Sequence, residues 1–129
     1  MGKTKSKVSK MLKIVEKIKQ DYNQYTYLWC KDDEAPYCYV GDPVIYYYPF
    51  YRISDEEDVF SLLHEIGHLE ANTPDMSDYQ KEYLATEWAI KHSKKYKITL
   101  TQECMDDWDI YIKGFHKRSD GKKLALKWA

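Results

Sequence analysis

The sequence predicts an α+β fold, in which a small antiparallel sheet of about three strands packs with three or four helices. Apolar residues recur at helical spacing near the N-terminus, tyrosine-rich strand-like segments follow, and the second half carries helix start signals. A chain of 129 residues has the size of one domain. We therefore expect a single domain over 1–129, with an N-terminal helix in 1–24, the sheet in 25–53, two central helices in 54–96 and a helical segment in 97–129.

The N-terminal helix is indicated by an amphipathic pattern in "VSKMLKIVEKIKQDY". Its apolar residues share one face: Val8, Met11, Leu12, Val15 and Ile18. The lysines of this segment are interpreted as a solvated face. The segments "YTYLWCK" and "YCYVGDPVIYYYPF" are rich in β-forming residues, and the second contains a turn at Gly41-Asp42-Pro43. The strand "VIYYYPF" is either an ordinary sheet strand or an edge on which an extended peptide pairs.

Capping signals place the later helices. Ser54 with Glu57 forms the pattern of a capping box for a helix that runs to about Ala71. Ser77 with Gln80 repeats the pattern for the next helix. A last helix is expected from Thr101, with an apolar stripe of Cys104, Trp108, Tyr111, Ile112 and Phe115.

The composition gives no indication of a nucleic-acid-binding or membrane-spanning protein. Lys and Arg total 20 and Asp and Glu total 21, so the net charge of −1 gives no reason to expect a nucleic-acid partner. No apolar run has the length of a membrane span. The three cysteines lack paired spacing, which indicates a reducing, cytoplasmic location. The sequence does not specify an oligomeric state.

The stretch "SLLHEIGHLE" contains the pattern H-E-x-x-H within the first central helix. His64 and His68 are one helical turn apart, so both imidazoles can face one metal ion. They lie on a different face from the apolar stripe of this helix, which argues against ordinary core histidines; a solvated surface pair remains an alternative. Glu65 is rotated away from the two ligands and is placed to act on a water as a catalytic base. Gly67 allows a close approach, of a strand, a substrate or a packed helix.

A catalytic zinc site normally has a third protein ligand. Glu82 shares a helix face with the small residues Ala85 and Ala89, along which another helix can pack closely, and Thr86 can support a ligand there. Glu87 falls with Lys91 as an ordinary surface pair. The remaining candidates are the loop acids Asp75 and Asp78 and the distant His92.

The segments "LLHEIGHLE" and "EYLATEWA" together resemble the ImmA/IrrE group of small gluzincin-type metallopeptidases, which pair H-E-x-G-H with a downstream E-x-x-A-[ND]-x-F-A. The resemblance covers residues 54–92 and departs from the pattern at Thr86 and Trp88. It implies a zincin-like fold with His64, His68 and Glu82 as zinc ligands and Glu65 as the catalytic base. Members of this group are common in phages and mobile elements, and several are thought to cleave repressor proteins.

The expected function is therefore zinc-dependent hydrolysis of a peptide bond in a protein or peptide substrate. Two alternatives stay open. The chain is either a zinc-binding module that has lost turnover and acts by holding a protein partner, or a structural or inhibitory protein with an accidental H-E-x-x-H. The residue that stabilises the oxyanion is not specified among five candidates: Tyr46, Tyr47, Tyr48, Tyr51 and His116.

Overall fold

The computed structural model describes residues 2–39 and 41–128, with side chains from residue 7 onward. Its elements are α1 (Gly2–Asp21), β1 (Thr26–Trp29), β2 (Tyr37–Tyr39), β3 (Val44–Tyr47), α2 (Glu56–Ala71), α3 (Asp78–Ser93) and α4 (Gln102–Lys113). Short 3-10 turns lie at Phe50–Arg52 and Arg118–Asp120. The described chain is thus α+β with four helices and a small three-stranded sheet, as the sequence predicts.

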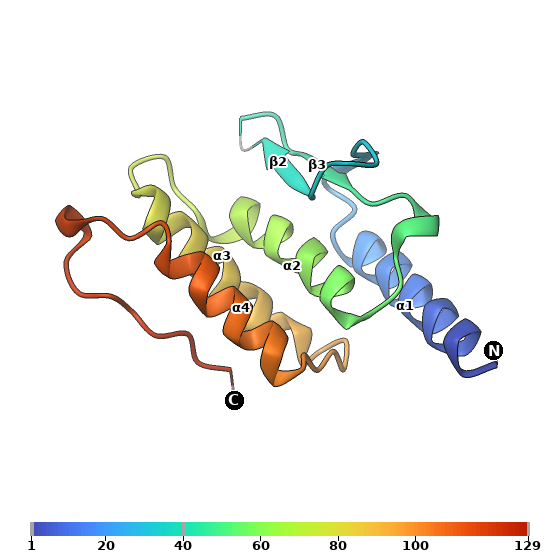
Figure 1. The fold of residues 1–129 in the computed structure, drawn as a ribbon. Coiled ribbons are helices and arrows are strands. Elements are labelled where there is room, and N and C mark those ends of the chain that lie inside the picture. The colour runs from blue at the N-terminus through green and yellow to red at the C-terminus, as the bar shows by residue number, and fades with distance from the viewer. Residues whose placement is uncertain (1, 40, 129) are drawn as a thin grey trace.

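Helix α2 is the centre of the fold. Figure 1 shows α1 and the sheet on one side of it and the pair α3 and α4 on the other. The apolar stripe that the sequence predicts for α2 consists of Val59, Leu62, Leu63, Ile66 and Leu69. Its first four residues have no exposed surface, and Leu69 is partly buried against the same core. This stripe packs into one core with buried residues of α1, β3 and α3. Burial of such side chains contributes roughly 1.5–3 kcal/mol each to the stability of the fold around α2.

The sheet is mixed, which corrects the expectation of an antiparallel sheet. The strand order is β1-β3-β2, with β3 parallel to β1 and antiparallel to β2. The β2–β3 hairpin is the one that the turn around Gly41-Asp42-Pro43 predicts, but β3 also inserts beside β1. The strands are only three or four residues long, and β3 alone alternates between buried and part-exposed residues, so the burial patterns do not specify the strand order.

The central position of β3 also rules out one expectation about substrate pairing. Both edges of β3 are already paired, so "VIYYYPF" offers no free edge to a peptide. The strand next to α2 with an unpaired edge is β2.

Helix α2 begins one residue later than the capping pattern predicts. Its N-cap is Asp55, whose side chain accepts from the backbone N–H of Asp58, while the Asp58 carboxylate accepts from the backbone N–H of Asp55. Ser54 also donates to Asp58, so the acid at this position serves two backbone donors. The other two starts are as predicted, with Ser77 and Gln80 forming a capping box on α3 and Thr101 capping α4.

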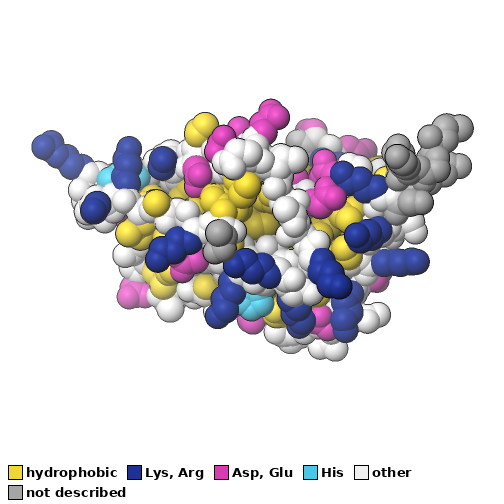
Figure 2. Space-filling view, turned by 90° about the horizontal axis from the view of Figure 1, so that it is seen from below, with side chains coloured by type: hydrophobic (Ala, Val, Ile, Leu, Met, Phe, Trp, Pro, Cys, Tyr) yellow, Lys and Arg dark blue, Asp and Glu magenta, His cyan; other side chains and the backbone are white. Residues whose placement is uncertain are grey.

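Figure 2 shows basic side chains over much of one face, with acidic side chains along its upper edge and also among the basic ones on its lower margin. Among the described residues, no helix has both the length and the apolarity needed to cross a membrane.

Gly67 explains how α2 and α3 come close enough to share a site. A Cβ atom at this position would lie 2.5 Å from the carbonyl oxygen of Ala85 and 3.1 Å from its Cα, both in the backbone of α3. Ala85 and Ala89 are fully buried in the same contact. Of the expectations for this glycine, helix packing is the one that the structure confirms.

The substitution Gly67→Ala is therefore expected to force α3 away from α2 and to lower the free energy of unfolding by about 1–3 kcal/mol. Gly41→Ala is the matched control, because a Cβ atom at Gly41 meets nothing within 4 Å. Urea unfolding of both variants measures the difference. Equal midpoints would show that the close contact at Gly67 is not required.

Candidate metal centre

The two histidines of α2 converge on one point in the interior. The Nε2 atoms of His64 and His68 lie 3.1 Å apart, and the rings cross at 84°. His64 is only 2% exposed, because α3 and α4 cover the face of α2 that is opposite to the sheet. The alternative of a solvated histidine pair is thus wrong, although the separation of this face from the main apolar stripe is as predicted.

Glu82 of α3 meets both histidines. Its Oε1 lies 3.4 Å from Nε2 of His64, and its Oε2 lies 2.8 Å from Nε2 of His68. The small residues on the same face of α3 allow this approach, because Ala85 packs on the backbone at Gly67. Glu87 is exposed on another face of α3, as the sequence predicts.

A hydrogen-bond network fixes the ring nitrogen that His64 presents at this point. The hydroxyl of Thr86 donates its single hydrogen to the carbonyl oxygen of Glu82 at 2.8 Å. It must then accept from Nδ1 of His64, which lies 3.0 Å away. His64 therefore carries its proton on Nδ1, and its Nε2 is a free base. This is the supporting role that the sequence predicts for Thr86.

His68 has the same arrangement through Asn72, the C-cap residue of α2. The amide nitrogen of Asn72 donates to the carbonyl oxygen of Lys81 at 3.1 Å, which turns the amide oxygen toward Nδ1 of His68 at 2.6 Å. His68 therefore also donates from Nδ1 and leaves Nε2 free. Asn72 was not predicted, but its signal is in the sequence: it follows His68 by four residues, as His68 follows His64.

These donors fit a divalent metal ion. His64, Glu65 and His68 each bring a ligand atom within 4.8 Å of the others, and such a group could hold an ion. The oxygens of Glu82 lie nearer to the two Nε2 atoms than Glu65 does, whose Oε2 is 4.0 Å from Nε2 of His64. Neighbouring corners of a tetrahedron with zinc–ligand distances of 2.0–2.2 Å are about 3.3–3.6 Å apart. The His64–Glu82 separation of 3.4 Å falls in this range, whereas the separations of 3.1 Å between the histidines and 2.8 Å between His68 and Glu82 are shorter, so small shifts would be needed to seat the ion.

The Glu82 carboxylate faces both Nε2 atoms, so its negative charge is stabilised by positive charge at this point, either protons on the imidazoles or a bound cation. Burial alone would raise the pKa of Glu82, but the adjacent imidazoles of His64 and His68 lower this pKa well below the usual value. Burial lowers the pKa of His64. The pKa of His68 is raised, because the Glu82 carboxylate outweighs the effect of burial. Glu82 is thus held as a carboxylate against the imidazoles.

Glu65 is the second buried acid of the site, with 8% of its surface exposed. Burial raises its pKa to about 7. The thiol of Cys38 on β2 lies close enough to Glu65 to contribute to that pKa, and both side chains line a cavity with His68 and Glu82. Glu65 therefore lies beside the point where the histidines converge and also reaches open space.

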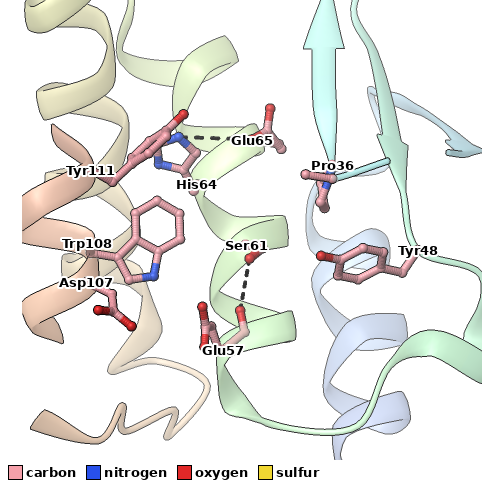
Figure 3. Close-up of a pocket in the computed structure, with 10 residues that line it drawn as sticks. Pro36, Tyr48, Glu57, Ser61, His64, Glu65, Asp107, Trp108 and Tyr111 are labelled. Atoms are coloured by element: carbon pink, nitrogen blue, oxygen red, sulfur yellow. Dashed lines mark hydrogen bonds and ion pairs between the residues drawn. The ribbon is translucent and has the colours of Figure 1, made fainter. Parts of the chain in front are cut away.

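Two pockets meet at Glu65. One is lined by residues of α2, α4 and the segment before β2, and Figure 3 shows the side chains around it. The other opens toward His68 and Lys81. Both are lined by Pro36, Glu65 and Tyr111, so these three residues form a wall that the two pockets share.

Tyr111 of α4 is a site residue that sequence reasoning did not identify. Its hydroxyl donates to Oε1 of Glu82 at 2.9 Å, and its ring lies 6.4 Å from that of His64. Trp108, one turn earlier, packs its ring 4.9 Å from His64. Both were predicted as core residues of the last helix, and nothing in the sequence indicates that this helix packs against the histidines.

The other candidates lie elsewhere. Asp75 and Asp78 are exposed, and His92 donates to the carbonyl oxygen of Trp88 while stacking on its ring. Of the five oxyanion candidates, Tyr48 lines the pocket at Glu65. The other four have contacts away from it: Tyr46 stacks on Tyr37, Tyr47 donates to Asp58, Tyr51 donates to Asp32, and His116 contacts the carbonyl oxygen of Gly121.

Comparisons with protein families, curated proteins and solved structures find no match to this chain.

Proposed function

We propose that the chain is a zinc-dependent metallopeptidase that hydrolyses a peptide bond in a protein substrate. The observation that carries the proposal is the convergence of two free Nε2 atoms and the Glu82 carboxylate beside the buried acid Glu65. Thr86 and Asn72 hold the two imidazoles in the tautomer that binds metal. Histidines with a purely structural role would not require that both Nε2 atoms be left without a proton and face the Glu82 carboxylate.

In the proposed assignment His64, His68 and Glu82 hold the zinc, and the resemblance to ImmA/IrrE peptidases points to the same three residues. When bound, zinc supplies Lewis-acid activation of a water and of the scissile carbonyl. Glu65 takes a proton from the attacking water and passes it to the amine that leaves as the C–N bond breaks. Water thereby becomes the hydroxyl of the new carboxyl group, and no other reactant is needed.

We also propose a reducing, cytoplasmic location, in which Cys30, Cys38 and Cys104 stay free thiols, as they are among the described residues. A cytoplasmic regulator of a phage or mobile element is the substrate class that the family resemblance favours. The proposed alternative is a zinc-binding module without turnover, which would bind a protein partner at the same two pockets.

Zinc analysis is the direct test. The purified chain is expected to contain about one zinc per molecule, or to take it up when the metal is offered. It is then expected to hydrolyse peptides from a mixed library in a reaction that a chelator stops and zinc restores. Absence of zinc uptake would end the peptidase proposal, whereas zinc uptake without hydrolysis would favour the binding module.

Tyr111 is the proposed donor to the oxyanion, because its hydroxyl lies beside Glu82 and lines both pockets; its single hydrogen would have to turn from Oε1 of Glu82 to the substrate. Tyr111→Phe is expected to lower kcat by about 10²–10³-fold, the effect of removing one oxyanion donor, when the variant is measured at saturating zinc. Tyr48→Phe is the control on the far wall of the pocket. Equal kcat values for the wild type and Tyr111→Phe would assign the donor elsewhere.

A further inference from the structure

The pocket between α2 and α4 has two chemically different ends. Its volume is about 330 Å³. In Figure 3, His64, Glu65 and Tyr111 lie at one end and Glu57 and Asp107 at the other. The volume is near the lower limit of about 300–1,000 Å³ for ligand pockets, so the space suits a side chain rather than a large ligand.

The walls between these ends are aromatic. Trp108 forms the wall on α4, and Tyr48 lies on the opposite side, beyond α2. The Trp108 ring is held by Phe60, at a centroid distance of 5.1 Å, and by His64. Such walls favour the aliphatic stem of a long side chain, and an indole face also attracts a cation.

The distal end carries negative charge without a matching cation. Glu57 and Asp107 are exposed, and neither forms an ion pair within the described residues. The Glu57 carboxylate accepts from the thiol of Cys104 at 3.2 Å, which does not neutralise it. No Lys or Arg is among the described residues that line the pocket. Carboxylates in this setting favour a positively charged ligand.

One buried donor of the wall has no partner. The indole Nε1 of Trp108 is enclosed and makes no hydrogen bond within the part of the chain that the structure describes. In Figure 3 this nitrogen is on the side of the ring toward Ser61 and Glu57. An unpaired buried donor costs free energy. Because the nitrogen is enclosed, a peptide acceptor would reach it only after the indole ring turned toward the pocket.

We infer that this pocket selects a lysine or arginine side chain of the substrate, next to the bond that is cleaved. The inference rests on the proposed peptidase function, because it places the scissile bond at Glu65. The aliphatic stem lies along Trp108, and the cationic group reaches Glu57 and Asp107 at the distal end. An apolar side chain would fill the same walls but leave both carboxylates without a partner.

Binding to an inactive form tests the pocket separately from hydrolysis. The probes are the peptides acetyl-Ala-Ala-Xaa-Ala-Ala-amide, in which Xaa is arginine, lysine, norleucine or glutamate. They are titrated into the zinc-loaded Glu65→Gln chain, and the NMR signal of the Trp108 indole N–H reports occupancy. The arginine and lysine peptides are expected to bind about five- to tenfold more tightly than the norleucine peptide, with the preference shrinking as salt is added.

Matched charge variants assign the preference to this pocket. The double substitution Glu57→Gln and Asp107→Asn should make the arginine and norleucine peptides bind equally. The control Glu103→Gln and Asp106→Asn removes the same charge from residues outside the pocket lining, and should keep the preference. Equal binding by the parent chain, no binding at millimolar peptide, or a preference that survives the first double variant would each overturn the inference.

The two proposals fail in different ways. Cleavage of library peptides by the wild type with no enrichment of Lys or Arg would reject the pocket assignment and keep the peptidase. A charge-dependent preference in the Glu65→Gln chain, combined with no hydrolysis by the wild type, would reject the peptidase and keep the pocket as a binding site.

Discussion

Glu65→Gln will lower the rate of peptide hydrolysis by about 10²–10⁴-fold, the usual contribution of a general base. The amide has the shape of the carboxyl group but cannot take a proton from water. Because Glu65 is 8% exposed and its burial already disfavours the charged form, a neutral replacement will not destabilise the fold. Steady-state kinetics, zinc content and a thermal melt of the same preparation measure the three effects.

The zinc content of this variant separates two roles for Glu65. As a base it is dispensable for the metal, and zinc should stay near one per chain. Loss of zinc in Glu65→Gln would instead make Glu65 the carboxylate ligand, in agreement with its membership of the group with His64 and His68. Hydrolysis at the wild-type rate would remove Glu65 from the mechanism altogether.

The sequence predicts the α2 and α3 part of the site because its signals are local. The His64–His68 ladder, the small-residue face that carries Glu82, and the position of Thr86 all follow from helical periodicity. Periodicity states which residues share a face, and the close contact at Gly67 then brings the two faces together. The hydrogen bonds of Thr86 also indicate which ring nitrogen of His64 is left free, and a sequence pattern cannot specify this.

The position of β3 in the sheet and the packing of α4 against the site could not be predicted from the sequence, because both depend on contacts between distant parts of the chain. Strand order depends on which edges pair, and strands of three or four residues are too short to encode it, so β3 was expected in an antiparallel sheet. Tyr111 reaches Glu82 only because α4 packs across α3, a contact between residues 29 positions apart. An apolar stripe on α4 indicates burial but not the neighbour against which it is buried.

Glu82→Ala is expected to weaken zinc binding by well over 100-fold, more than the 10–100-fold typical of losing a residue that only supports a ligand. Glu82 contacts the Nε2 atoms of both histidines, which lie 3.1 Å apart. Its removal leaves only these two histidines as protein ligands. Two protein ligands do not make a stable zinc site of the usual kind. Competition with a chromophoric chelator measures the affinity.

Glu87→Ala is the matched control, five residues further along the same helix and exposed to solvent. It should leave zinc affinity unchanged and alter the free energy of unfolding by no more than about 0.5 kcal/mol, as for other exposed surface positions. Glu87 forms no ion pair with Lys91 within the described residues. Retention of zinc by Glu82→Ala together with its loss from Glu65→Gln would exchange the roles of the two acids. The Glu82–histidine contacts would then be hydrogen bonds that orient the rings, and the metal would lie on the Glu65 side of α2.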